Sequence, residues 1–190
     1  MMATIENAAL EAPNVILTPR AVSEQIAIRA SRMRNGDLAD LRRGKTGVVA
    51  PVFQRLLDEF QEIMGANIED WVVIAQFIAI LSNNAPGARP IHSKEMRLGR
   101  ALASGGHYNP KGTSSAISEE RVMKLLRSPE RQRGEALVRI ARSLHPNFGV
   151  RGRVNVGDVA DFILGKNRRE IQRRIAQDYY SALYFMSKSE

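Results

Sequence analysis

The side chains of this chain with the clearest chemical potential are cationic. The 190 residues include 28 Lys and Arg, of which 22 are Arg, against 20 Asp and Glu. Residues 1–93 carry 9 cationic and 10 acidic side chains, a net −1, whereas residues 94–190 carry 19 and 10, a net +9. Arginine stays charged at any working pH, and its planar donors match phosphate oxygens. The second half of the chain therefore predicts a polyanionic partner, most commonly a nucleic acid.

Helical spacing gathers several of these cations onto faces. In the segment that begins at Ser118, a rotation of 100° per residue separates an apolar arc from a cationic one. The cationic arc consists of Arg121, Lys124 and Arg127. In the next helix, Arg139 and Arg142 lie three residues apart. In the last helix, Arg169 and Arg173 form an i, i+4 pair. That helix is roughly 28 Å long, which is enough to follow several phosphates of a strand. Ordinary solvated faces are the alternative, but the excess recurs in three helices and two loops.

No enzymatic motif accompanies this charge. The sequence GKT at 44–46 resembles the end of a phosphate-binding loop, but the glycine required five residues earlier is Ala39. His92, His107 and His145 lack a partner at metal-ligand spacing. There is no cysteine and no Gly-x-Ser-x-Gly elbow. The adjacent carboxylate pairs Asp58-Glu59, Glu69-Asp70 and Glu119-Glu120 diverge by about 100° on a helix and cannot share a metal unaided. We therefore expect a binding protein with no catalytic residue, no metal and no cofactor.

The elements that carry these residues all have a helical period, and no internal repeat or alternating strand is present. The pattern predicts an all-α class, a compact bundle of about eight or nine helices with two basic loops. Breakers and caps place the helices at 19–34, 38–43, 51–64, 69–81, 94–103, 118–127, 131–144, 155–164 (with Asp158 an alternative start) and 167–185. Trp71 to Leu81 is apolar on nearly all sides and should be the central buried helix, since 11 residues are too few for a bilayer, which needs about 20.

The distribution of helical and non-helical segments also predicts the domain organisation. Residues 1–18 read as a flexible N-terminal segment without a targeting signal, because they contain Glu6 and Glu11, no Lys or Arg, and no continuous apolar core. Residues 19–190 read as a single helical domain, with a division into lobes 19–92 and 93–190 left open. The absence of cysteine fits a reducing compartment, and we expect a cytoplasmic protein.

The segment RLGRALASG at residues 97–105 resembles the signature of the CasB family, the small subunit of the type I-E CRISPR Cascade complex. Three further segments resemble that family in order and spacing: LADLRRG at 38–44, ERVMKLLR at 120–127 and LVRIARSL at 137–144. With the basic last helix, the likeness covers roughly residues 24–185. The loop at 104–116 is longer than the turn expected after the signature.

This resemblance implies a non-catalytic subunit of an antiviral defence complex. Two copies would lie beside a large subunit, along a ribonucleoprotein whose backbone subunits hold the CRISPR RNA (crRNA). They would stabilise the hybrid that the crRNA forms with target DNA, and they would also hold the displaced non-target strand. Exchanging a DNA duplex for this hybrid changes the free energy little. Cationic contacts that do not depend on base sequence can therefore shift the equilibrium toward the R-loop. No membrane and no small-molecule substrate are implied.

Carried over by position, the resemblance implies RNA-binding and DNA-binding residues, all of them cationic. They are Arg42, Arg43, Arg100, Arg121, Lys124, Arg127, Arg131, Arg139, Arg142, Arg169 and Arg173. Lys111, Arg151 and Arg153 are added on loop position and charge alone. Instead of binding nucleic acid, Arg100 could cap or bridge helices. Arg42 and Arg43 could instead stabilise a helix C-terminus, where cations are favoured.

Three other classes remain as alternatives. A sequence-specific helix-turn-helix regulator should carry Asn, Gln, Ser or Thr among the arginines of its recognition helix, and residues 118–127 offer little of that. A scaffold for an acidic protein and a hydrolase with an unrecognised site are the others.

Overall fold

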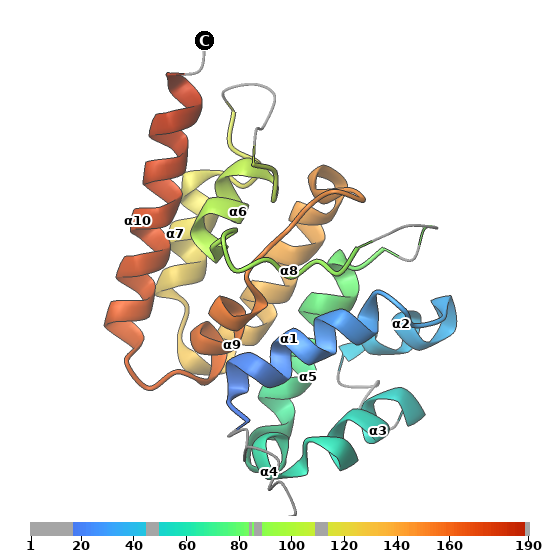
Figure 1. Cartoon of the computed structure of the whole chain (residues 1–190). Helices are drawn as coiled ribbons and strands as arrows, with labels where there is room; N and C mark the ends of the chain where they lie inside the picture. The colour runs from blue at the N-terminus through green and yellow to red at the C-terminus, as the bar shows by residue number, and fades with distance from the viewer. Residues whose placement is uncertain (1–16, 45–49, 84, 86–88, 109–113, 189–190) are drawn as a thin grey trace, which may run out of the picture.

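The computed structural model describes residues 17–44, 50–83, 85, 89–108 and 114–188 (Figure 1). The helices are α1 Pro19–Ala30, α2 Asn35–Arg42, α3 Pro51–Glu59, α4 Gln61–Met64, α5 Ile68–Leu81, α6 Leu98–Ser104, α7 Glu119–Arg127, α8 Glu130–Phe148, α9 Val156–Leu164 and α10 Arg168–Ser187. Over these residues the β-structure is limited to an isolated bridge between His92 and Val154. The predicted all-α class is confirmed. The expected flexible segment 1–18 lies, up to residue 16, outside the described residues.

Helix α5 forms the centre of the core, as predicted. Its residues from Trp71 to Leu81 are buried apart from the partly buried Val73, and α1, α2, α8 and α9 pack around it. The Trp71 Nε1–H donates to the carbonyl of Ile63 at 3.3 Å. The stretch Gln61–Leu81, which includes α5, is one helical run long and apolar enough to cross a membrane, and 56% of its apolar window is buried inside the protein. A core helix passes that test equally well.

Helix α10 runs along one side of the molecule and packs against α6, α7 and α9 (Figure 1). The crossing with α6 is close because Gly99 has no side chain. A methyl group there would lie 2.1 Å from the carbonyl oxygen of Ile175 and 2.8 Å from the Cβ of Asp178. The buried Tyr179 hydroxyl donates to the carbonyl of Ile117 at 2.7 Å, which fixes the segment before α7 against α10.

Several predicted helix boundaries are confirmed by their local chemistry. Thr18 accepts a hydrogen bond from the N–H of Ala21 at the start of α1, and Pro51 occupies the first turn of α3. Gly44 ends the segment after α2 with φ of 65°, a conformation that favours glycine. Asn155, one of the two proposed openers, caps α9 by accepting from the N–H of Asp158 at 3.3 Å.

Other boundaries were predicted wrongly. Helix α1 ends at Ala30, and Asn35-Gly36 forms the first turn of α2 instead of a break. The apolar stripe at 51–64 is not one helix, because Phe60 leaves the helical region with φ −114° and ψ 29° while its ring is buried.

Two more boundaries differ at α6 and α8. Helix α6 starts at Leu98, four residues later than expected. Helix α8 continues through the exposed Pro146 to Phe148, although His145-Pro146 was expected to end it. A proline in the last turn removes one intrahelical hydrogen bond, and burial of the Phe148 ring keeps that turn in place.

Candidate nucleic-acid interface

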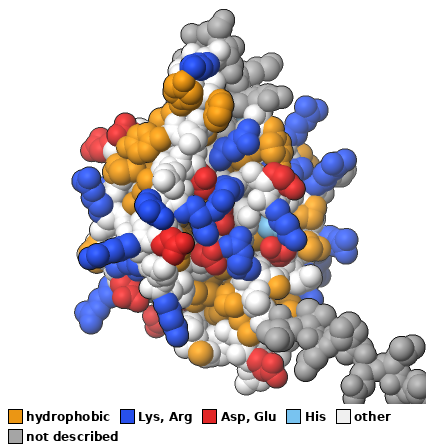
Figure 2. Space-filling model, turned by 60° about the vertical axis from the view of Figure 1, so that its left-hand side comes forward, with side chains coloured by type: hydrophobic (Ala, Val, Ile, Leu, Met, Phe, Trp, Pro, Cys, Tyr) orange, Lys and Arg blue, Asp and Glu red, His pale blue; other side chains and the backbone are white. Residues whose placement is uncertain are grey.

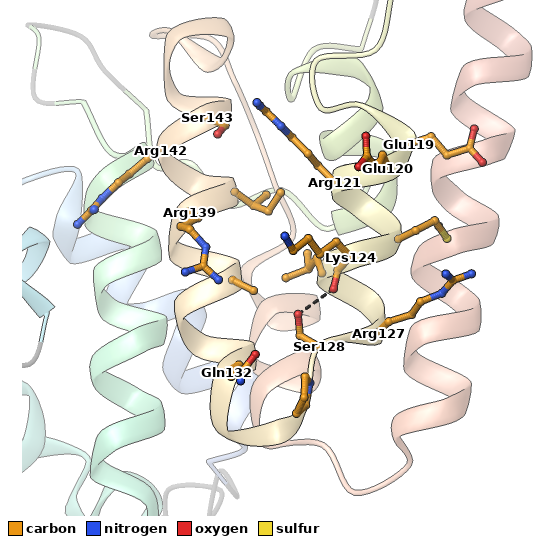
Figure 3. A pocket seen from close by; sticks show the side chains of 15 residues that line it. Glu119, Glu120, Arg121, Lys124, Arg127, Ser128, Gln132, Arg139, Arg142 and Ser143 are labelled. Carbon is orange, nitrogen blue, oxygen red and sulfur yellow. Dashed lines mark hydrogen bonds between the residues drawn. The ribbon is translucent and has the colours of Figure 1, made fainter.

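A groove of about 1180 Å³ lies between α7 and α8 (Figure 3). The buried face of α7 consists of Val122, Leu125 and Leu126, so its cationic residues face outward, as the helical spacing predicts. Helix α8 likewise buries Leu137, Ile140, Ala141 and Leu144. Five cationic side chains line the groove: Arg121, Lys124, Arg127, Arg139 and Arg142. The fold therefore brings together five predicted residues from two helices.

Not all five point the same way. Arg121 and Lys124 extend from α7 toward α8, the Arg139 side chain lies along the front of α8, Arg127 points toward α10 and Arg142 points away from α7 (Figure 3). We define the first three as the groove triad. Because all three line the same groove, they can contact successive anionic groups of one bound chain.

Side chains from α10 hold the end of α7 in place. Arg168 donates to the carbonyl of Ser128, and Gln172 donates to the carbonyl of Leu126. The Ser128 hydroxyl donates to the carbonyl of Lys124 at 2.8 Å, which closes the last turn of α7 beside the groove (Figure 3). The end of the helix that carries Arg121 and Lys124 is thus fixed before any ligand arrives.

The groove is electropositive. Two carboxylates, Glu119 and Glu120, also line it, so five cations against two anions give a net charge of +3. Glu119 accepts a hydrogen bond from the Tyr180 hydroxyl at 2.7 Å, and this bond raises the pKa of Tyr180. Arg139 lies 3.9 Å from Glu135 on the same helix, with both side chains mostly exposed, which is a weak pair.

Over the described residues, no carboxylate lies within ion-pair distance of Arg121, Lys124 or Arg127. Their charge is not neutralised within that part of the protein and remains available to a ligand.

Arg42 has an internal role. Its Nε donates to the carbonyl of Ala79 at 2.9 Å and its Nη2 to the carbonyl of Ser82 at 3.0 Å, which satisfies the C-terminal end of α5. This geometry favours the alternative that the sequence left open for Arg42, although the helix it stabilises is α5. The buried Arg133 does the same for α9 by donating to the carbonyl of Phe162 at 2.8 Å.

The remaining predicted residues lie elsewhere. Arg43 pairs with Asp40 at 2.7 Å. Arg131, Arg169 and Arg173 are exposed on α8 and α10, and Arg151 is exposed in the turn after α8, but none of them lines the groove. Lys111 lies outside the described residues.

Arg100 and Arg153 belong to a second basic region, around Tyr108. The Arg100 guanidinium lies over the Tyr108 ring, 5.8 Å from its centroid, and its Nη2 donates to the Tyr108 carbonyl at 3.4 Å. Burial lowers the pKa of Arg153, and the neighbouring positive charge of Arg89 lowers it further. Sequence reasoning missed Arg89, because it is an isolated arginine in a loop and carries no periodic signal.

Three other arginines are neutralised internally. Arg97 lies 3.0 Å from Asp178, and Arg20 and Arg174 both pair with Asp161. Burial raises the pKa of Asp178, although the Arg97 charge opposes that effect. On the side of the molecule that includes α10, Lys and Arg side chains accordingly lie among acidic ones and do not form an unbroken cationic surface (Figure 2). The convergent cations of the described structure are those of the α7–α8 groove and the Tyr108 region.

In the part of the chain that the structure describes, no three His, Asp or Glu side chains gather into a possible metal site. His107 Nε2 lies 2.8 Å from the carbonyl oxygen of Asn147, and His92 Nε2 lies 3.5 Å from Glu24. The His107 contact joins the turn after α6 to α8, whereas the buried His92 Nε2 has no hydrogen-bond partner among the described residues.

Fold and groove together define an all-α protein with a basic cleft between two helices. The chain belongs to the family of the CRISPR-associated protein Cse2, whose family model matches residues 37–180. Cse2 is the small subunit of type I-E Cascade, also called CasB, so the resemblance in the sequence is confirmed. The matched residues include the signature helix α6 and the whole groove. No curated protein and no solved structure matched the chain.

Proposed function

We propose that this Cascade subunit is non-catalytic and that its α7–α8 groove binds the phosphate backbone of a nucleic-acid strand without reading its sequence. The observation that carries the proposal is the groove triad, in which cations from two helices line one groove. Within the complex, the bound strand would belong to the crRNA–target hybrid or to the displaced non-target strand. Cationic contacts to either one favour the R-loop over the closed duplex.

The lining of the groove supports backbone binding over base reading. That lining has five Arg or Lys side chains, against one amide, Gln132, and two hydroxyls, Ser128 and Ser143. The Ser128 hydroxyl already donates to the carbonyl of Lys124. A sequence-specific regulator needs several amide or hydroxyl groups placed on base edges. We further propose that the subunit acts in the cytoplasm beside a second copy of itself and the backbone and large subunits of Cascade.

The salt dependence of binding tests the groove. The purified chain is titrated with two single-stranded oligonucleotides of unrelated sequence, and the logarithm of the association constant is plotted against that of the salt concentration. Each phosphate contact contributes about −0.7 to the slope. Replacing Arg121, Lys124 and Arg139 together by Ala should therefore reduce the slope by about 2 and weaken binding to both strands equally.

A matched control removes the same charge elsewhere. Arg32, Arg34 and Arg55 are exposed and lie outside the groove. Their joint replacement by Ala should leave the slope close to that of the wild type. Equal flattening by the two triple variants would show that net charge, and not the groove, binds the strand. A strong preference for one duplex sequence would instead indicate a regulator.

A further inference from the structure

The turn after helix α6 places an exposed aromatic ring among arginines. Gly105 and Gly106 have φ of 69° and 79°, which turns the chain back at the end of α6. A side chain at Gly106 would collide with the ring of Phe148 and the carbonyl of Arg153. Two residues later Tyr108 remains 45% exposed, whereas most large apolar and aromatic side chains described are buried.

Backbone pairing between distant segments brings three arginines to this ring. The N–H of Val154 donates to the carbonyl of Ile91 at 2.8 Å, and the N–H of Arg153 donates to the carbonyl of Gly106 at 2.9 Å. Arg89 and Arg153 are thereby brought to the turn that carries Tyr108, and Arg100 reaches the ring from α6. We call Tyr108, Arg89, Arg100 and Arg153 the Tyr108 cluster.

The Tyr108 ring and the Arg153 guanidinium are held in place before any ligand binds. The Ser93 hydroxyl donates to the Glu95 carboxylate, so it accepts from the Tyr108 hydroxyl, 2.6 Å away. Arg153 Nη1 donates to the carbonyls of Val150 at 3.3 Å and Gly152 at 2.7 Å. Glu95 lies at the hydroxyl end of the ring.

The charge of the cluster is not balanced around Arg153. Arg89 and Arg153 are close enough for their repulsion to add to the effect of burial in lowering the pKa of Arg153. In the described part of the chain, no carboxylate lies within ion-pair distance of Arg89, Arg100 or Arg153. An anion between Arg89 and Arg153 would relieve that repulsion.

We propose that the Tyr108 cluster binds one unpaired nucleotide of a single strand, with its base stacked on the Tyr108 ring and a phosphate between Arg89 and Arg153. An aromatic ring beside cations is the combination that holds single-stranded nucleic acid, because every base offers a flat π face. A base inside a duplex is already stacked and cannot reach the ring. The proposal rests on the proposed function only in taking nucleic acid as the ligand, and it adds a second subsite with base-stacking character.

The experiment compares a base-containing strand with one that lacks bases. Oligothymidine and an abasic oligonucleotide of equal length are titrated with the wild-type chain and with Tyr108→Ala. The variant should bind oligothymidine about tenfold more weakly and the abasic strand within about twofold of wild type. Tyr108→Phe, which keeps the ring, should bind both strands like the wild type. Oligodeoxyuridine and oligouridine, which carry the same base and differ in the sugar, form the second arm. A loss on any base-containing strand supports the subsite, and the comparison of these two strands identifies the sugar that it accepts.

A matched control is Tyr180→Ala. Tyr180 is 42% exposed, close to the 45% of Tyr108, but its hydroxyl donates to the Glu119 carboxylate, an anionic setting. It should bind both strands like the wild type. Tyr108→Leu, which keeps an apolar side chain without a π face, should bind like Tyr108→Ala, and thermal unfolding checks that each variant is folded.

Three results would overturn the subsite. In the first, Tyr108→Ala weakens the binding of abasic and base-containing strands equally. In the second, it weakens the binding of neither. In the third, the wild type binds strands with and without bases equally well. If Tyr108→Ala binds like the wild type while the groove-triad variant loses its salt dependence, the subsite fails and the proposed function stands. If wild type and all variants fail to bind any strand, both fail.

Discussion

The carboxylate of Asp158 on α9 accepts a hydrogen bond from the backbone N–H of Leu98, the first residue of α6, at 3.2 Å. The same carboxylate accepts from Arg20 on α1 at 3.2 Å and from Arg174 on α10 at 3.3 Å. One side chain, only 3% exposed, therefore ties α9 and its neighbour α10 to α1 and α6, which are distant in the sequence. It also explains why α6 begins at Leu98.

Replacing Asp158 by Ala should lower the free energy of unfolding by about 2 to 3 kcal/mol, because the first turn of α6 loses an acceptor and Arg20 and Arg174 keep only Asp161 as a counter-charge. Urea unfolding followed by circular dichroism measures the change. Asp40→Ala, which breaks an exposed pair with Arg43, is the control and should cost under about 1 kcal/mol. Similar costs for both variants would contradict a structural role for Asp158.

Gly99→Ala should destabilise the protein by about 2 to 3 kcal/mol, because its methyl group would force α6 away from the backbone of α10. Gly36→Ala is the matched change in a helix with open space around it, and it should raise stability by about 0.5 kcal/mol. Thermal unfolding of both variants checks the contrast. A tolerated Gly99→Ala would mean that the two helices do not cross this closely.

Arg42→Met should lower the free energy of unfolding by about 1 to 2 kcal/mol, since the carbonyls at the end of α5 lose a charged donor while the aliphatic stem is retained. The slope of nucleic-acid binding against salt should stay unchanged. Arg43→Met, which affects a surface pair, serves as the stability control. A flatter slope for Arg42→Met would return Arg42 to the binding surface.

His92 should make stability depend on pH below neutrality. Burial lowers its pKa from 6.5, and the charges of Lys94 and Arg20 act in the same direction, while Glu24 and Glu95 oppose them. The unfolded chain then binds a proton more readily than the folded one, so the contribution is present above pH 6.5 and is lost as pH falls below it. Comparing urea unfolding at about pH 7.5 and about pH 5.5 measures this loss.

His92→Asn supplies the control for that measurement. Asparagine keeps an acceptor for the N–H of Val156 but does not titrate. The variant should lose less stability than wild type between the two pH values. An equal loss in both proteins would assign the dependence to other groups.

Features that depend on neighbours within one helix could be predicted from the sequence. The separation of Arg121 and Lys124 from Leu125 follows from helical period alone, and the structure reproduces it. The long apolar run around Trp71 is likewise stable only when it is buried, so its place in the core could be predicted.

Features that depend on distant segments could not be predicted. Arg89 reaches Arg153 through backbone pairing between residues some 60 positions apart, and no local pattern encodes that pairing. The role of Arg42 depends on where α5 ends, and the continuation of α8 past Pro146 depends on the burial of Phe148. In each case a tertiary contact outweighed the local preference.

Because the Asp158 carboxylate is held inside the protein, dissolved ions screen its pairs poorly, whereas they screen the exposed side chains of Arg121 and Lys124 well. Ionic strength therefore acts on the two sets of charges separately. Concentrated salt should strip a polyanion from the surface and leave the folded chain intact, so the subunit can be freed of nucleic acid during purification without a denaturant.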